Sequence, residues 1–158
     1  MTLFKKLFAT VAFIALTSTV SLAVAAQPST HKTSLQEHNK EIVLAFYNAA
    51  LNEKNIDKAL SYLAPDFKQH NPTAEDGPQG VRKFLEWVKS DHPNSHSDIK
   101  QVFTDGNYVI LNVHMVRFPG QPGLAIAEFF RLKNGKIAEH WDRIQAIPDQ
   151  SKNTNTMF

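Results

Sequence analysis

The 158-residue chain contains no cysteine. Without thiols it can form no disulfide, no thiolate metal site and no cysteine nucleophile, so its stability must come from packing. It has only six glycines, all in predicted turns, and none forms a glycine-rich loop that could cradle a phosphate. No serine lies in a nucleophile-elbow sequence, and no pair of histidines has the spacing of a metal site.

An excess of charge is also missing once the N-terminal segment is set aside. The chain has 17 Lys and Arg against 15 Asp and Glu, and residues 1–26 hold two lysines and no acid. The remaining residues therefore carry fifteen charges of each sign. No dense basic run is left, so neither a nucleic acid nor an anionic membrane surface is an expected partner.

Residues 1–26 have the pattern of a secretory signal peptide. Lys5 and Lys6 precede an apolar run over 7–16, and the segment ends in Ala23-Val24-Ala25-Ala26, the small residues that a signal peptidase requires. The alternative is a retained membrane anchor, because residues 7–26 are nearly long enough to span a bilayer. The small-residue ending favours cleavage. We therefore predict an exported protein, periplasmic or secreted, with no stable membrane anchor after cleavage.

Cleavage would leave 132 of the 158 residues, enough for one domain with its own core. A polar lead-in over 27–33 precedes the predicted domain at 34–148, and a tail follows at 149–158. Three segments show apolar residues at helical spacing: 34–52, which opens with the capping box Ser34-Leu35-Gln36-Glu37, then 56–63 and 81–91.

The periodicity then changes to two, which is typical of strands. The predicted strands are 99–104, 108–118, 124–133 and 136–147, with a short extended segment at 67–71 between the second and third helices. Helices followed by an antiparallel meander predict an α+β fold in which the helices pack on one face of a curved sheet.

The last predicted hairpin places Glu128 beside a tryptophan. Asn134-Gly135 favours a two-residue type I′ turn, and regular pairing from that turn puts Glu128 opposite Trp141. His140 and Asp142 flank Trp141 and should point to the other face of the strand. A surface or subunit-contact role is expected for them there, unless a bulge re-aims them.

The preceding hairpin adds a histidine to the same row. A five-residue loop at 119–123 would pair Phe118 with Leu124 and place His114 opposite Glu128. Burial raises the pKa of a carboxylic acid and a nearby imidazolium lowers it, so such a pair can be tuned for proton transfer. A buried structural His–Glu pair is the alternative, and spacing alone leaves both open.

Three segments resemble the SnoaL-like polyketide cyclases of the nuclear-transport-factor-2-like superfamily. They are Phe67-Lys68-Gln69-His70-Asn71-Pro72, the stretch from Phe129 to Ile137, and Glu139-His140-Trp141-Asp142. The resemblance implies a cone-shaped, cystatin-like roll: three N-terminal helices under a strongly curved antiparallel sheet, with a largely apolar pocket in its mouth. It also implies a homodimer, no metal and no cofactor.

The same resemblance implies roles for single residues. Glu128 takes the position of the family's acid–base carboxylate and His114 that of its histidine neighbour, while His70 and Trp141 would line the pocket. The cyclases usually carry Asp where this chain has Glu128. The longer side chain moves the carboxylate by ~1 Å, a displacement that can cost ~10²-fold in rate.

From these residues we expect a pocket for a small apolar or cyclic molecule, in which Ile126 and Phe130 exclude water beside the carboxylate. The leading hypothesis is a cofactor-independent lyase or isomerase that acts on cyclic carbonyl compounds by aldol-type or proton-abstraction chemistry. The alternative is an exported binding module that holds a small apolar ligand without chemistry.

Overall fold

The computed structural model describes residues 30–158, with side chains from residue 34. The predicted signal segment therefore lies outside the described residues. Within them, no helix is both long and apolar enough to cross a membrane.

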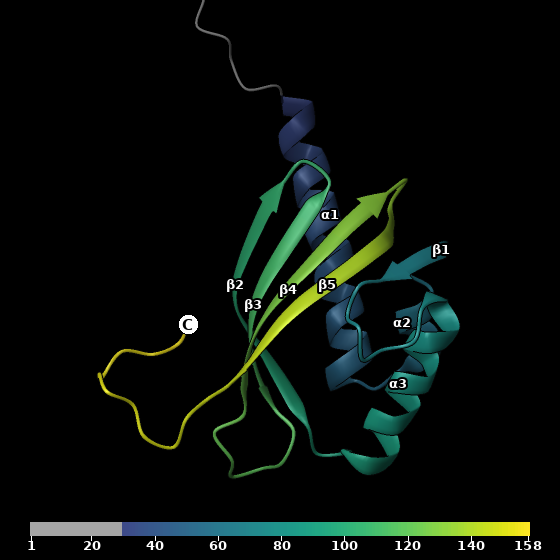
Figure 1. Cartoon of the computed structure of the whole chain (residues 1–158). Coiled ribbons are helices and arrows are strands. Elements are labelled where there is room, and N and C mark those ends of the chain that lie inside the picture. The colour runs from purple at the N-terminus through teal and green to yellow at the C-terminus, as the bar shows by residue number, and fades with distance from the viewer. Residues whose placement is uncertain (1–29) are drawn as a thin grey trace, which may run out of the picture.

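Helices dominate the first part of the chain, with one strand among them, and four strands follow (Figure 1). The helical elements are α1 (Thr30–Tyr47), the π-helical turn η1 (Asn48–Asn52), α2 (Ile56–Leu60) and α3 (Gly77–Asp91). The strands are β1 (Leu63–Gln69), β2 (His96–Asp105), β3 (Tyr108–Val116), β4 (Leu124–Lys133) and β5 (Lys136–Ala146). They form one sheet in the order β1-β5-β4-β3-β2, which confirms the predicted α+β class.

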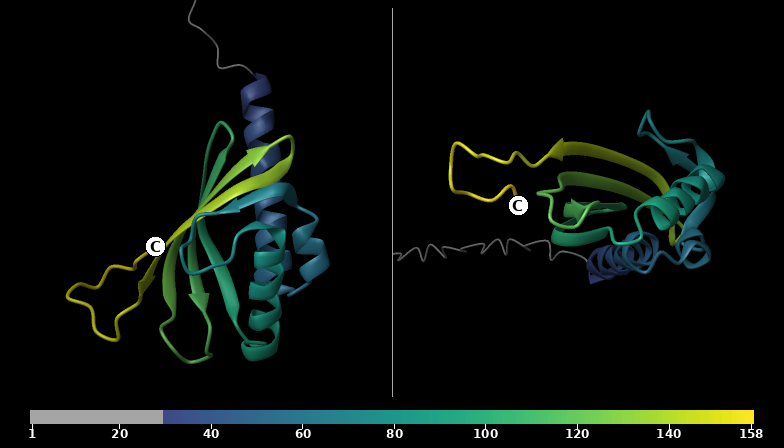
Figure 2. Two further views of the ribbon diagram at one scale, coloured as in Figure 1. Left: turned by 45° about the vertical axis from the view of Figure 1, so that its right-hand side comes forward. Right: turned by 90° about the horizontal axis from the view of Figure 1, so that it is seen from below.

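The sheet is strongly curved, and the helices lie on its concave side (Figure 2). Helix α1 contributes Val43, Phe46 and Tyr47 to the core, and all three are buried. Phe46 meets Phe130 of β4 edge to face, with ring centroids 5.9 Å apart. Such edge-to-face pairs add to the stabilisation that burial of the two rings provides.

Both ends of the first helix differ from the prediction. Helix α1 already begins at Thr30, so the prediction that Ser34 starts the helix is wrong. Glu37 forms an ion pair with Lys40 at 2.5 Å. At the other end the chain widens into η1, and Asn52 exchanges two hydrogen bonds with the Ser97 backbone, which fixes the helix end to β2.

Strand β1 lies at the edge of the sheet and runs parallel to β5, pairing Leu63 with Ile137 and Gln69 with His140. The His70 amide donates to the His140 carbonyl at 2.9 Å. The strand thus begins four residues before the extended segment predicted at 67–71 and ends two residues before its end. Its pairing brings the loop after β1 beside β5.

The turn between β4 and β5 has the predicted conformation. Asn134 and Gly135 have φ angles of 54° and 70°, as a type I′ turn requires, and Lys133 pairs with Lys136. The pairing then slips between Arg131 and Leu132, because β5 has one extra residue there.

That extra residue is Ala138, a β-bulge in which the consecutive residues Ile137 and Ala138 are both buried. Beyond the bulge Glu128 pairs with Asp142. The predicted pairing of Glu128 with Trp141 is therefore wrong by one residue, and a one-residue slip exchanges the two faces of a strand.

The β3–β4 hairpin also departs from its predicted register. Leu124 pairs with Met115 instead of Phe118, so His114 lies opposite Ala125 and Leu111 lies opposite Glu128. The shift of three positions is odd, so it moves His114 to the outer face. Val109, Leu111, Val113 and Met115 are core residues.

Candidate functional site

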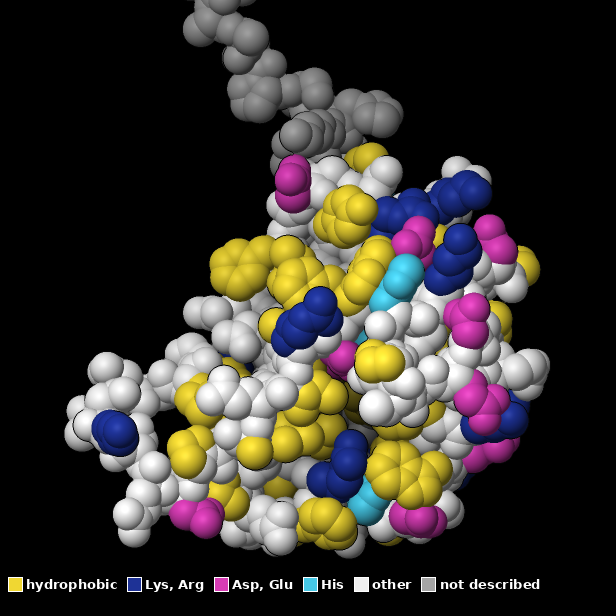
Figure 3. Space-filling view, viewed as in Figure 1, with side chains coloured by type: hydrophobic (Ala, Val, Ile, Leu, Met, Phe, Trp, Pro, Cys, Tyr) yellow, Lys and Arg dark blue, Asp and Glu magenta, His cyan; other side chains and the backbone are white. Residues whose placement is uncertain are grey.

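A pocket of about 660 Å³ opens between the concave face of the sheet and the helices. Its volume falls in the range of small-molecule sites. Figure 3 shows hydrophobic side chains gathered around the hollow between the sheet and α3. Most of its wall is apolar, and four polar side chains meet at one place in its lining: Tyr47, Glu128, His140 and Asp142.

Glu128 is the centre of this polar group and is only 6% exposed. The Tyr47 hydroxyl donates to its Oε1 at 2.8 Å, and His140 Nε2 lies 2.6 Å from its Oε2. Ile126 and Phe130, on the same face of β4, are buried on either side of it and line the pocket. The carboxylate is thus satisfied by two partners in an otherwise apolar wall.

The proton arrangement of His140 follows from its second neighbour. The Asn71 backbone N–H donates to Gln69 Oε1, which is therefore the amide oxygen and can only accept. His140 Nδ1 lies 3.0 Å from the same oxygen, so Nδ1 carries a proton. Nε2 is then the nitrogen that exchanges a proton with Glu128. The pair is either a carboxylate with an imidazolium or a carboxylic acid with a neutral imidazole.

Tyr47 is a permanent donor in this group. Burial raises the pKa of its hydroxyl well above the ordinary value of 10, and the adjacent Glu128 raises it further. The hydroxyl therefore stays protonated at physiological pH and keeps donating to Glu128 Oε1.

Asp142 is held beside the pair by the loop after β1. Asn71 Nδ2 lies 2.9 Å from one Asp142 oxygen and 2.7 Å from the other. Asp142 thereby places a second carboxylate within 4.8 Å of the His140 donor atom. The loop thereby contributes to the charge balance of the site.

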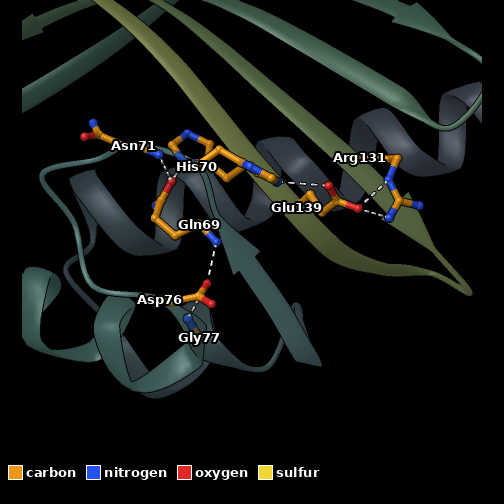
Figure 4. Close-up of polar contacts among 8 residues, drawn as sticks. Gln69, His70, Asn71, Asp76, Gly77, Arg131 and Glu139 are labelled. Atoms are coloured by element: carbon orange, nitrogen blue, oxygen red, sulfur yellow. Dashed lines mark hydrogen bonds and ion pairs between the residues drawn. The ribbon is translucent and has the colours of Figure 1, made fainter.

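The loop is itself tied to the first turn of α3 (Figure 4). Asp76, the N-cap of α3, accepts from the backbone N–H groups of Gln69 at 2.7 Å and of Gly77 at 2.9 Å. These backbone bonds lower the pKa of Asp76, the one from Gln69 most. They also hold Gln69 where its amide can orient His140.

Among the described side chains, one group is close enough together to hold a metal ion: Glu128, His140 and Asp142. One donor atom of each lies within 4.8 Å of the others. His140 Nε2 is already bonded to Glu128 in this arrangement. The geometry is that of a directly bonded proton-transfer pair.

The structure does not bring His114 to Glu128. His114 lies on the outer face, where its Nε2–H donates to the Pro122 carbonyl at 2.8 Å and its ring lies 5.1 Å from that of Phe158. The predicted pairing of His114 with Glu128 is wrong because of the β3–β4 register. His140 takes that place, re-aimed by the bulge at Ala138.

His70 and Trp141 do not line the pocket either. Their rings stack on the outer side of β5, 4.3 Å apart and nearly parallel. Figure 4 shows His70 bonded to Glu139, which also pairs with Arg131. For Trp141 the bulge is again the cause, because it turns Trp141 outward as it turns His140 and Asp142 inward.

Sequence reasoning missed Tyr47, Gln69 and Asn71. Tyr47 carried a usable signal, since it follows Phe46 on the buried face of α1 and a buried tyrosine hydroxyl needs a partner. The roles of Gln69 and Asn71 depend on the parallel β1–β5 pairing, for which the sequence has no local signal.

Comparison with solved structures finds the same fold. A putative ketosteroid isomerase from Kribbella flavida is 15% identical, with 75% of this chain and 85% of that chain covered and a TM-score of 0.61. A putative polyketide cyclase from Acidithiobacillus ferrooxidans is 20% identical, with 68% and 87% covered and a TM-score of 0.57. An NTF2-like protein of unknown function from Cytophaga hutchinsonii is 21% identical, with 68% and 89% covered and a TM-score of 0.58.

The comparison with curated proteins gives no match. The family model described as the SnoaL-like domain matches residues 43–140, which run from the middle of α1 to His140 on β5. The matched stretch contains Tyr47, Gln69, Asn71, Glu128 and His140. The chain therefore belongs to the SnoaL-like domain family.

Proposed function

We propose that the chain is a cofactor-independent lyase or isomerase that removes a proton next to a carbonyl group of a small, largely apolar molecule. The observation that carries this proposal is the buried Glu128 carboxylate, bonded to His140 and Tyr47 in the wall of an apolar pocket. A desolvated carboxylate with a directly bonded proton partner is suited to general acid–base catalysis.

In the first step Glu128, in its carboxylate form, takes the α proton of the substrate. The C–H bond breaks, an O–H bond forms on Glu128, and the electron pair moves to the carbonyl oxygen to give an enolate. The His140 imidazolium, no longer facing a charged carboxylate, can then donate to the enolate oxygen. Tyr47 donates to Glu128 Oε1 and holds the carboxyl group in place during this transfer.

Return of the proton to a different carbon completes an isomerisation. Attack of the enolate carbon on a second carbonyl of the same molecule completes an aldol reaction, in which the new alkoxide takes the proton that Glu128 holds. Both outcomes use one transferable proton and leave the site unchanged. Neither needs a group that the described residues do not supply.

Proton exchange tests the first step without knowledge of the natural substrate. A panel of cyclic ketones and aromatic polyketides is incubated in D₂O with the protein, and loss of the α-proton signal is followed by NMR. We expect exchange with the natural chain and a loss of about 10²–10⁴-fold in Glu128→Gln. Glu139→Gln is the matched control, because Glu139 is bonded to Arg131 and His70 on the outer side of β5.

Ligand binding is measured in parallel by thermal shift. A ligand at a hundred times its dissociation constant stabilises the fold by about 2.7 kcal/mol. Binding retained by Glu128→Gln together with lost exchange supports the proposal. Equal exchange in Glu128→Gln and the natural chain contradicts it, and binding without any exchange indicates the non-catalytic binding module instead.

A further inference from the structure

We infer that the pocket takes an apolar molecule that carries a carboxylate, and that Arg117, the residue after β3, binds this group. The inference rests on the proposed function only in that it assigns a substrate class to the same pocket. It concerns the opposite end of the pocket from Glu128.

Arg117 is the cationic residue of the pocket lining that has no carboxylate partner among the described residues. It is half-buried, and within residues 34–158 no carboxylate lies within ion-pair distance of its guanidinium. Lys83, the other long cation that lines the pocket, is paired with Glu75 at 2.7 Å. A guanidinium without a counter-charge beside an apolar cavity is placed to receive one from a ligand.

Trp87 of α3 holds the guanidinium in position. The central guanidinium carbon of Arg117 lies 4.9 Å from the Trp87 ring centroid, a cation–π contact between the β3 end and α3. Trp87 in turn meets His92 edge to face, and His92 meets Phe118 in the same way.

This contact leaves the guanidinium able to bind. The contact is made through the charge of the guanidinium, and no hydrogen bond joins its N–H groups to Trp87. A guanidinium can bind a carboxylate through two N–H groups in its own plane while it lies over an aromatic ring. Two parallel N–H groups match the two oxygens of a carboxylate, and such charge-assisted pairs are about twice as strong as neutral hydrogen bonds.

The position of Arg117 sets the length of the ligand. Leu111 lies opposite Glu128, and Arg117 follows it by six residues, which is on the order of 20 Å along a strand. The long side chains at both ends shorten this gap to the length of a molecule with two fused or linked rings. Met115, Leu124 and Ile126 line the apolar stretch between.

Electrostatics then fix the orientation of the ligand. Glu128 and Asp142 at the far end repel a carboxylate, whereas Arg117 at the mouth attracts it. A molecule with one carboxylate therefore enters with its uncharged end toward Glu128. That end is where the reacting carbonyl must lie.

Calorimetric titration with two probes of the same shape tests the inference. Biphenyl-4-carboxylate carries the charge, and biphenyl-4-carboxamide is its neutral counterpart. We expect the natural chain to bind the acid more tightly than the amide. We expect Arg117→Gln to weaken acid binding about tenfold to a hundredfold while leaving amide binding unchanged. Arg82→Gln removes the same charge from an α3 residue that pairs with Asp57, and it should change neither.

Equal binding of acid and amide by the natural chain overturns the inference, as does failure of the acid to bind at millimolar concentration. Equal weakening in Arg117→Gln and Arg82→Gln also overturns it, because the effect would then be general charge. These titrations need no turnover. Loss of the Arg117 effect with intact, Glu128-dependent proton exchange would reject the carboxylate alone, and the reverse result would reject the chemistry alone.

Discussion

At the scale of single residues, the hydrogen bond from the Tyr47 hydroxyl to Glu128 can be removed without changing the packing of the core. Tyr47→Phe keeps the ring in the core and deprives Glu128 Oε1 of its donor. A buried acceptor left without a partner costs about 1–3 kcal/mol, so we expect the free energy of unfolding to fall by that amount. Urea denaturation followed by circular dichroism measures it.

Tyr62→Phe is the matched control, since Tyr62 is half-buried and packs against the same core. Its free energy of unfolding should change by less than about 0.5 kcal/mol, as is usual for a change that breaks no buried contact. Equal losses in the two variants would mean that the Tyr47–Glu128 bond contributes nothing specific.

At the scale of elements, the loop between β3 and β4 sets which face His114 occupies. Gly120 and Gly123 have nearly the same φ, 87° and 88°, but a Cβ on Gly123 would lie 2.5 Å from the Met115 carbonyl oxygen, whereas one on Gly120 would meet nothing within 4 Å. Alanine at either position costs about 1–2 kcal/mol for the left-handed backbone. We expect Gly123→Ala to cost a further 1–3 kcal/mol or so through overpacking.

Urea denaturation of the two alanine variants checks this difference, with Gly120→Ala as the reference for backbone strain alone. The loop closes where it does because Gly123 allows the close approach to Met115. Similar unfolding free energies for both variants would show that this close contact does not hold the register.

The β3–β4 and β4–β5 hairpins show what the sequence could and could not predict. Periodicity and turn residues gave the class, the element order and the bounds of β4, and Asn134-Gly135 gave the turn type. The bulge at Ala138 and the close approach at Gly123 depend on contacts between strands, which local patterns do not encode. Glu128 was therefore found from its own strand, whereas its partner histidine was misassigned.

At the scale of the whole molecule, three carboxylates bind protons less readily in the folded chain. Backbone donation from Gln69 lowers the pKa of Asp76, His96 lowers that of Asp98, and Arg131 lowers that of Glu139. A lowered folded-state pKa stabilises the fold above the unfolded value, about 4, and this contribution is lost as pH falls toward the folded value.

We therefore expect the urea midpoint to be steady from pH 7 to about 5 and to fall below pH 4. Asp76→Asn keeps an oxygen that can accept from Gln69 and Gly77 but cannot titrate. The fall of its urea midpoint below pH 4, the acid limb of the pH profile, should therefore be shallower. Asp57→Asn, at an exposed carboxylate that pairs with Arg82, is the comparison. An acid limb in Asp76→Asn as steep as that of the natural chain would contradict this assignment.

The parallel pairing of β1 with β5 has a consequence for biosynthesis. A ribosome delivers the chain from its N-terminus, so β1 and its loop emerge long before β5 does. Until then Gln69 and Asn71 lack His140 and Asp142 as partners, and β1 has no neighbour in the sheet. The polar site therefore closes last, and a nascent or prematurely ended chain exposes two unpaired strand edges to aggregation and proteolysis.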